Sequence, residues 1–371
     1  MNQTYTPKFQ EEYSAKIPAL TLLTSLGWTF LSPKQIMDYR GYKQDEVVLR
    51  PVLREELSKR SFMAGGKTCQ LSEKALDNLI SQVCSPALNE GLLKANERMY
   101  NHLLYGIAVT EFVDGKKINP TIALIDWEHP ENNQFHFTEE FTVLRSGGVE
   151  TRRPDIVCFV NGIPLAVIEA KSPAGHGKKG PTIDEGISQS IRNQFNDEIP
   201  QLFAYSQLLL SINGHDGRYG TCHTPMKFWA AWREEDITDP QMYALRNHPL
   251  STEQIHALFD HRPSVDLKWY QQLIDGGELA VSGQDKLLIS LLSPERLLEM
   301  TRFFTLFDKK TGKIVARYKQ VFGIKRLLER ISTRRPDGGR EGGVIWHTTG
   351  SGKSYTMVFL SKALILHDSL K

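Results

Sequence analysis

The sequence predicts an α/β protein, in which a mixed sheet flanked by helices is followed by the beginning of a second α/β unit. Three observations lead to this fold class. Apolar residues in the first ~110 positions recur mostly at helical spacing. Between about residues 105 and 171, β-rich segments alternate with turn-forming pairs such as Asp114-Gly115 and Asn119-Pro120. Near residue 350, a short apolar segment, a glycine-rich loop and a helical pattern follow one another.

The N-terminal part is expected to be helical. Apolar positions at helical spacing precede Gly27, a residue type that commonly ends a helix. These positions are Ile17, Leu20, Leu23 and Leu26. A further helix is predicted from Ser72 to Val83, with Leu79 and Ile80 facing the core.

The central part is expected to supply the sheet. Segments rich in β-branched and aromatic residues predict strands; they span residues 106–112, 121–127, 135–143, 155–160 and 165–171. A glycine- and lysine-rich loop at 172–181 then leads to a helix around 183–196. Another apolar run covers 202–212.

The remaining chain divides in two. Residues 236–290 predict a helical connector interrupted by turn signals, and residues 291–371 a separate unit. In that unit, Ser293-Pro294-Glu295 has the capping hydroxyl, the proline and the acid typical of a helix start. Val344–Trp346 is a strand candidate, and a helix is expected from Ser351 onward.

Composition excludes several classes of protein. No apolar stretch approaches the ~18 residues needed to span a bilayer, so no membrane partner is expected and a cytoplasmic location is the default. The four cysteines include no C-x-x-C pair, which argues against a zinc site and against a disulfide framework. The net charge of +2 allows a local basic groove but does not by itself indicate a nucleic-acid binder.

The stretch richest in chemistry begins at Asp155, which Glu169 and Lys171 follow on the next predicted strand. Side chains alternate along a strand, so Glu169 and Lys171 point to the same face. Two carboxylates on adjacent strands can hold Mg²⁺, which prefers oxygen ligands. Lys171 could then orient or deprotonate a water molecule that attacks a phosphodiester. The alternative is a surface salt bridge at a hairpin, which would contribute little.

The register of this hairpin decides whether the two carboxylates meet. A two-residue turn at Asn161-Gly162 would place Asp155 opposite Ile168, on the wrong face. Pairing Asp155 with Glu169 requires an odd loop centred on Gly162, or a bulge. We therefore predict a three- or five-residue connection.

The run from Arg153 to Lys171 resembles the PD-(D/E)XK nuclease motif. Its core, Val-Asn-Gly-Ile-Pro-Leu, is similar to the form found in restriction (R) subunits of type I restriction–modification enzymes. The resemblance implies a PD-(D/E)XK endonuclease domain over residues 1–235. It also implies metal ligands at Asp155 and Glu169 and a catalytic lysine at Lys171.

The same family carries a Q-x-x-x-Y element after the lysine. Gln189 is placed suitably but is followed by Asn193, whereas Gln201 and Tyr205 match literally one segment later. We favour Gln189 as the further catalytic residue because it is nearer the hairpin. For an upstream acid, Glu11 and Glu12 are candidates, although exposed acids at a helix start are the simpler interpretation.

A glycine-rich sequence ending in Gly352-Lys353-Ser354 predicts a nucleotide site. Its backbone N–H groups would surround phosphate at a helix N-terminus, with Lys353 on the β/γ-phosphates and Ser354 on Mg²⁺. The loop residues expected to contribute are Thr349, Gly350, Ser351 and Gly352. His347 departs from the usual first glycine of this pattern.

This segment resembles the first motif of superfamily 2 helicases, again in the R-subunit form, which implies a RecA-like helicase lobe that binds ATP. Arg317-Tyr318-Lys319-Gln320 looks like that superfamily's adenine-reading element, with Gln320 on the base. It is also a suitable helix start, and both interpretations can hold together. The chain stops 18 residues after Lys353, so we expect an N-terminal fragment of a longer subunit.

The resemblance implies a Mg²⁺-dependent endonuclease part of an enzyme that translocates and cleaves double-stranded DNA with ATP. It implies modification and specificity subunits as partners. Two alternatives stay open: a DNA end-processing repair nuclease–helicase, and a catalytically silent platform for DNA binding or assembly. In that family another subunit recognises the DNA site, so this sequence does not reveal which DNA sequence is recognised.

Overall fold

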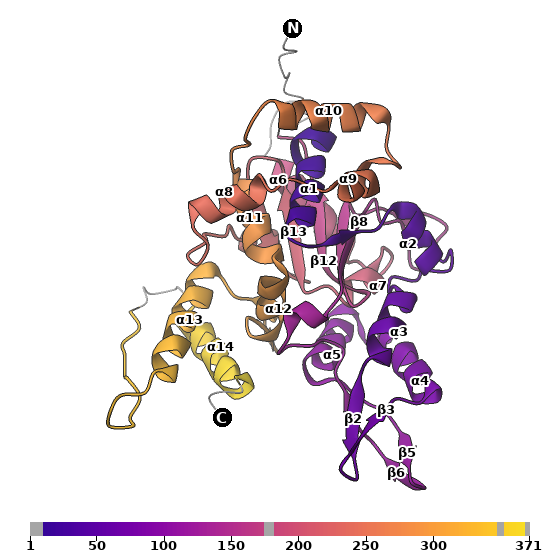
Figure 1. The fold of residues 1–371 in the computed structure, drawn as a ribbon, viewed down its shortest axis with the longest axis vertical. Coiled ribbons are helices and arrows are strands. Elements are labelled where there is room, and N and C mark those ends of the chain that lie inside the picture. The colour runs from indigo at the N-terminus through magenta and orange to yellow at the C-terminus, as the bar shows by residue number, and fades with distance from the viewer. Residues whose placement is uncertain (1–9, 174–181, 347–351, 368–371) are drawn as a thin grey trace.

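A six-stranded sheet lies at the centre of the molecule, in the order β1-β8-β11-β12-β13-β14 (Figure 1). The structure is a computed structural model that describes residues 10–173, 182–346 and 352–367. The strands are β1 (Thr29–Phe30), β8 (Phe135–Glu139), β11 (Ile156–Val160), β12 (Ile163–Ala170), β13 (Leu208–Ile212) and β14 (Gly217–Gly220). The pairs β1–β8 and β12–β13 are parallel, and the others are antiparallel. The mixed sheet of an α/β protein is therefore confirmed.

The middle of this sheet is the deepest part of the core. Every residue of β11 and β12 is buried, as expected of strands covered on both faces. Helix α6 (Thr182–Arg192) packs against β12 and β13, and α11 (Gly283–Leu292) packs against β14. Helix α7 (Pro200–Phe203) and the short η4 (Met226–Phe228) lie before β13 and after β14 in sequence.

The β11–β12 hairpin reaches the required register by a route that differs from our prediction. Its turn is the two-residue pair Asn161-Gly162, with φ of 51° and 79°, rather than a three- or five-residue loop. The register then shifts between Cys158 and Phe159, which leaves Leu165 as an additional residue in β12. This bulge moves the later part of β12 by one position, so Asp155 comes opposite Glu169. The predicted loop length was wrong, and the alternative of a bulge is correct.

Asn161 suits this turn because it tolerates a left-handed backbone and satisfies buried polar groups. Its side chain is fully buried, donates to Leu124 O (2.9 Å) and Asn133 Oδ1 (2.8 Å), and accepts from the N–H of Gln134 (2.8 Å). The turn therefore also ties the hairpin to the loop ahead of β8.

Asn161→Ala is expected to lower the free energy of unfolding by about 2–4 kcal/mol, because it orphans buried groups and strains a left-handed residue. Denaturant unfolding would measure the loss. Asn161→Gly removes the same hydrogen bonds without the strain, so it should lose less. An alanine variant within ~0.5 kcal/mol of the original protein would contradict this account.

The N-terminal part is mainly helical, as predicted. Its helices are η1 (Glu12–Lys16, a π-helix), α1 (Ile17–Ser25), α2 (Pro33–Tyr39), α3 (Arg50–Ser58), α4 (Glu73–Cys84), η2 (Leu88–Glu90) and α5 (Leu92–Tyr105). The helix expected from Ser72 to Val83 corresponds to α4, where the Ser72 hydroxyl caps the N-terminus. The helical prediction missed a hairpin formed by β2 (Ser61–Ala64) and β3 (Lys67–Gln70).

Several of the expected strands are shorter than predicted and lie outside the central sheet. They form two-stranded pairs: β4 (Ile107–Ala108) with β7 (Thr121–Ile122), β5 (Glu111–Val113) with β6 (Lys116–Ile118), and β9 (Val143–Leu144) with β10 (Thr151–Arg152). A short helix, η3 (Pro130–Asn132), precedes β8. Figure 1 shows the hairpins β2–β3 and β5–β6 projecting together from one end of the molecule.

Segment 236–290 is helical and packs on α1. It contains α8 (Asp239–Arg246), α9 (Thr252–Phe259), α10 (Ser264–Asp275) and most of α11; α12 (Pro294–Arg302) follows. Helix α1 contacts α8, α9 and α11. Among the helices of the described ranges, none combines the length and apolar character needed to cross a bilayer.

The C-terminal part contains a hairpin of β15 (Thr305–Asp308) and β16 (Gly312–Val315), then α13 (Tyr318–Ser332) and α14 (Lys353–Leu366), which pack on each other. The strand predicted at Val344–Trp346 is wrong, because these residues have no regular structure. A strand needs a pairing partner, and the side chains of Val344 and Trp346 are 91% and 92% exposed.

Candidate active site

Asp155, Glu169 and Lys171 come together at one end of the β11–β12 hairpin. Lys171 Nζ lies 3.5 Å from Asp155 Oδ2 and 3.9 Å from Glu169 Oε2. Asp155 Oδ2 also accepts a hydrogen bond from the N–H of Ala170 (2.8 Å), which fixes this carboxylate against the end of β12. The bulge in β12 therefore brings together the three side chains that the sequence pattern singles out.

The two carboxyl groups differ in their surroundings. The Glu169 side chain is fully buried, whereas those of Asp155 and Lys171 are 11% and 15% exposed. Burial raises the pKa of Glu169 well above its ordinary value, and the nearby charge of Asp155 raises it further, while Lys171 opposes the shift. In its ionised form, neither oxygen of Glu169 accepts a hydrogen bond from the described residues. In its protonated form it can donate to Asp155.

This arrangement fits a divalent cation. A proton shared between two adjacent carboxyl groups offsets part of their negative charge. A divalent cation bound in the same place offsets more of that charge, and metal binding commonly displaces such protons. Within the described residues no group of three or more His, Cys, Asp and Glu side chains is arranged to hold a metal. A site built on Asp155 and Glu169 alone suits Mg²⁺, which usually binds one or two carboxylates and keeps several waters.

Helix α6 covers Glu169. Gly186 lies so close to the sheet that a Cβ there would clash with Ser211 Oγ and would sit 3.4 Å from the Cβ of Glu169. Gln189 follows Gly186 by three residues on this helix and is half-buried. Residues three apart share a helix face, so Gln189 lies on the same side of α6 as Gly186, which packs over Glu169.

Gln201 and Tyr205, which match the Q-x-x-x-Y pattern literally, make hydrogen bonds to neighbouring elements of the fold. Gln201 Nε2 donates to the carbonyl of Leu144 in β9 (2.6 Å). The hydroxyl of Tyr205, which is fully buried, donates to the carbonyl of Val83 in α4 (2.7 Å). These contacts tie α7 to neighbouring elements, and the choice of Gln189 over Gln201 as the further site residue stays a prediction.

Glu11 also lies near this cluster, which the sequence interpretation as an exposed helix-start acid did not anticipate. Burial and the charge of Asp155 raise the pKa of Glu11, while Lys171 lowers it. Glu11 in turn raises the pKa of Glu169. The sequence had offered Glu11 as a candidate upstream acid, but its place directly ahead of the π-helix η1 is seen only in the structure.

The described part of the nucleotide loop is limited to its last residues. Thr349, Gly350 and Ser351 lie outside the described residues, as does His347. Gly352 has φ of +86°, and Lys353 and Ser354 begin α14 with exposed side chains. The expected helix therefore follows the loop directly, as the motif requires.

Gln320 is buried and holds the start of α13 to this loop. Its Oε1 accepts from the N–H of Arg317 (2.9 Å), and its Nε2 donates to the carbonyl of Gly352 (3.3 Å). Both ends of the amide are thus engaged within the chain. Contact with adenine would require the side chain to exchange these hydrogen bonds.

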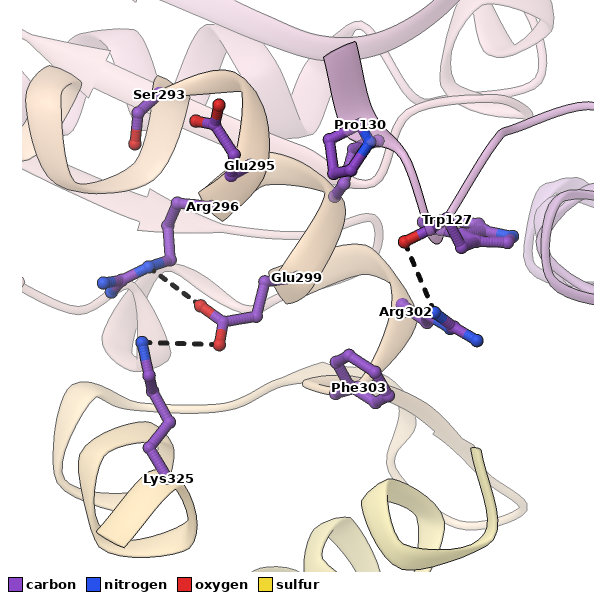
Figure 2. A pocket seen from close by; sticks show the side chains of 10 residues that line it. Trp127, Pro130, Ser293, Glu295, Arg296, Glu299, Arg302, Phe303 and Lys325 are labelled. Atoms are coloured by element: carbon purple, nitrogen blue, oxygen red, sulfur yellow. Dashed lines mark hydrogen bonds and ion pairs between the residues drawn. The ribbon is translucent and has the colours of Figure 1, made fainter. Parts of the chain in front are cut away.

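A cavity of about 380 Å³ lies at the junction of η3, α12 and α13 (Figure 2), and neither Asp155 nor Glu169 lines it. Glu299 on its wall pairs with Arg296 (3.0 Å) and with Lys325 (3.4 Å). Arg302 donates to the carbonyl of Trp127 (3.5 Å). These pairs join the sheet-bearing part of the chain to α13.

Comparison with known proteins identifies the family. The family described as the type I restriction enzyme R protein N terminus matches residues 8–228, more than half of the chain. The chain belongs to this family. The resemblance to R subunits drawn from the Val-Asn-Gly-Ile-Pro-Leu core is thereby confirmed. The SWI2/SNF2 ATPase family matches residues 319–371 of this R-protein family member.

Curated relatives of this chain are named as endonuclease subunits of type I restriction enzymes. The type I restriction enzyme HindI endonuclease subunit of Haemophilus influenzae is 29% identical over 96% of this chain and 30% of its own length. The putative MjaIXP endonuclease subunit of Methanocaldococcus jannaschii is 26% identical over 98% of this chain and 32% of its own length. A third relative, the putative MjaVIIP endonuclease subunit of the same archaeon, is 31% identical over 70% of this chain. The chain thus spans about 30% of the length of the first two relatives.

Proposed function

We propose that this chain is the DNA-cutting part of a type I restriction enzyme R subunit, with a Mg²⁺-dependent PD-(D/E)XK endonuclease site. The observation that carries the proposal is the convergence of Asp155, Glu169 and Lys171 at one end of the hairpin, in a chain of the R-protein family. The relatives are named as restriction endonuclease subunits, which favours restriction over DNA end-processing repair.

Asp155 and Glu169 would hold the cation. Bound there, Mg²⁺ would polarise the phosphodiester and lower the pKa of a water molecule. The hydrogen bond from Ala170 N–H keeps Asp155 oriented, and α6 shields Glu169 from bulk water. Burial raises the pKa of Glu169 and so favours its protonated form, whereas a bound cation would favour the ionised form and release of that proton.

Lys171 would act on the water and on the scissile phosphate. Its Nζ is held by the carbonyl of Ala170 (2.8 Å) at the partly exposed side of the site. A protonated ammonium here stabilises the negative charge that develops on the phosphate, and a neutral amine accepts a proton from the water. Gln189, on the covering helix, is the proposed further residue of the site.

The remaining roles concern the longer subunit. Lys353, Ser354 and the loop 349–352 would bind ATP in a RecA-like lobe that begins within residues 291–371, with Gln320 reading adenine after its bonds to Arg317 and Gly352 are exchanged. Double-stranded DNA would be the substrate, and modification and specificity subunits the partners. ATP-driven translocation would belong to the complete subunit.

Removal of the cation tests the nuclease proposal directly. The chain should convert supercoiled plasmid to nicked circles in millimolar Mg²⁺ without ATP, because the three side chains come from one hairpin. Chelation with EDTA should abolish the reaction, and added Mg²⁺ should restore it. Nicking that persists in EDTA, or that is absent with every divalent cation tried, would contradict the proposed site.

A further inference from the structure

A network of charged side chains joins segment 236–290 to the strand that ends beside Asp155. Its centre is Arg262, in the turn between α9 and α10, whose side chain is 7% exposed. The guanidinium pairs with Glu12 of η1 and with Glu139 of β8, and lies 3.5 Å from Asp266 of α10. Three carboxylates on three different elements thus meet one buried cation. Figure 1 shows α9, α10 and α1 gathered at the same end of the molecule.

A second buried cation continues the network toward the nuclease site. Lys16 Nζ lies 3.1 Å from Glu12 and 3.7 Å from Glu139, and it also pairs with Glu140. Glu140 follows β8 directly, and its N–H donates to the backbone carbonyl of Asp155 (2.9 Å). Arg153 pairs with the same Glu140. The contacts therefore run without a break from Arg262 to the backbone of a proposed metal ligand.

Contacts of His261 and Tyr13 further restrain the turn that carries Arg262. His261 Nε2 lies 2.7 Å from Glu139 Oε1 and stacks on Phe30 of the edge strand, with ring centroids 5.4 Å apart. The hydroxyl of Tyr13 donates to Asp266 (2.9 Å). The turn carrying Arg262 is thus held to the sheet edge as well as to η1.

The energetics make this arrangement sensitive to the loss of one member. Burial opposes the charge on Arg262, but Glu139 and Glu12 more than compensate and raise its pKa. The same holds for Lys16, where burial is outweighed by Glu12, Glu140 and Glu139. Removing one cation would leave buried carboxylates uncompensated, so η1 and the end of β8 would move apart or admit water.

We propose that Arg262 is a positioning residue of the nuclease site. It holds η1, which places Glu11 beside the cluster, against the end of β8, which supports the backbone of Asp155. The helical segment would thereby contribute to cation binding although it supplies no ligand. This inference rests on the proposed nuclease function.

The test compares two equally buried arginines in the 371-residue chain. Arg262→Met removes the centre of this network, whereas Arg296→Met removes an arginine that is also 7% exposed but pairs with Glu234, Asp236 and Glu299 near the cavity of Figure 2. Mn²⁺ binding would be titrated by calorimetry and by electron paramagnetic resonance, at a temperature where both variants are folded.

We expect Arg262→Met to weaken Mn²⁺ binding at least about tenfold, the usual effect of losing a supporting residue of a metal site. Arg296→Met should bind within about twofold of the original chain, and Arg262→Lys should recover part of the loss.

The outcomes separate this inference from the proposed function. Equal Mn²⁺ affinities for the two methionine variants would overturn the role of Arg262 and leave the metal site intact. A failure of the unaltered chain to bind Mn²⁺ would overturn both. If Arg262→Met does not fold, Glu12→Gln takes its place, because Glu12 is 31% exposed and its loss leaves Arg262 paired with Glu139 and Asp266. Glu12→Gln should also weaken Mn²⁺ binding, and unchanged affinity would overturn the inference.

Discussion

Replacing Lys171 with methionine is expected to slow Mg²⁺-dependent nicking of plasmid DNA by about 100-fold or more, the usual contribution of a positioned acid–base group. Among the described residues, Lys171 is the cation within ion-pair distance of both Asp155 and Glu169. Methionine is also unbranched and long, so packing changes little while the charge and the proton-accepting amine are lost. Single-turnover rates at saturating Mg²⁺ would measure the effect.

Saturating cation matters because Lys171 also lowers the pKa of Glu169. Without Lys171, Glu169 holds its proton to higher pH and binds a cation less well, so a rate measured at low Mg²⁺ would mix two effects.

Lys171→Arg keeps the charge but cannot give up a proton near neutral pH. Activity retained by arginine would assign an electrostatic role, and activity lost would assign proton transfer. Lys94→Met, at an exposed lysine of α5 that pairs with Glu90 of η2, is the surface control. A Lys171→Met rate within about threefold of the original would refute the proposed role.

Glu169→Gln is expected to weaken Mg²⁺ binding by at least about 100-fold. A charge pair about 4 Å apart contributes about 4 kcal/mol at an effective dielectric constant of 20, and a tenfold change in affinity corresponds to about 1.4 kcal/mol. Calorimetric titration of the chain with Mg²⁺ would measure the loss. Glu295→Gln, at an exposed glutamate beside the cavity in Figure 2, should leave the affinity unchanged.

The same substitution should remove a pH dependence of stability. Because the folded-state pKa of Glu169 is raised, its stabilising contribution is complete below the ordinary value of 4.5 and is lost as the pH rises through the raised pKa. Thermal unfolding of the metal-free chain should therefore show stability falling over that window, with Mg²⁺ restoring it. In Glu169→Gln the amide can donate to Asp155 at every pH, so this part of the slope should disappear. An unchanged slope in the variant would contradict the raised pKa.

Local sequence patterns correctly predicted helix starts and buried strands, which depend on residues close together in the chain. Helix α4 begins after the capping hydroxyl of Ser72, and α12 begins at Pro294, because caps and N-terminal prolines act within one helical turn. The hydroxyl of Ser293, which the sequence predicted as a cap, makes no capping hydrogen bond. The buried strands β11 and β12 follow from their continuous apolar runs. Strand expectations failed where no partner strand was available, as at Val344–Trp346, because pairing is a property of two segments.

For the candidate site too, some features follow from the local sequence and others depend on contacts between distant segments. That Glu169 and Lys171 share a face is determined by the two-residue period of a strand. Their meeting with Asp155 depends on the bulge at Leu165, which no turn preference of Asn161-Gly162 reveals. Likewise, the nearness of Glu11 to the carboxylates and the contacts of Gln201 and Gln320 join segments distant in sequence.

By itself, the sequence indicated the family, the main helices and the two central strands β11 and β12, and the three residues proposed to cut DNA, because each follows from short-range patterns. Only the tertiary structure decided that Glu169 is fully buried beneath α6 and that Arg262 joins η1 to β8. The physical reason is that burial and charge pairing depend on contacts between distant segments. Arg262 and Glu12 are 250 residues apart in the chain and meet only when it is folded.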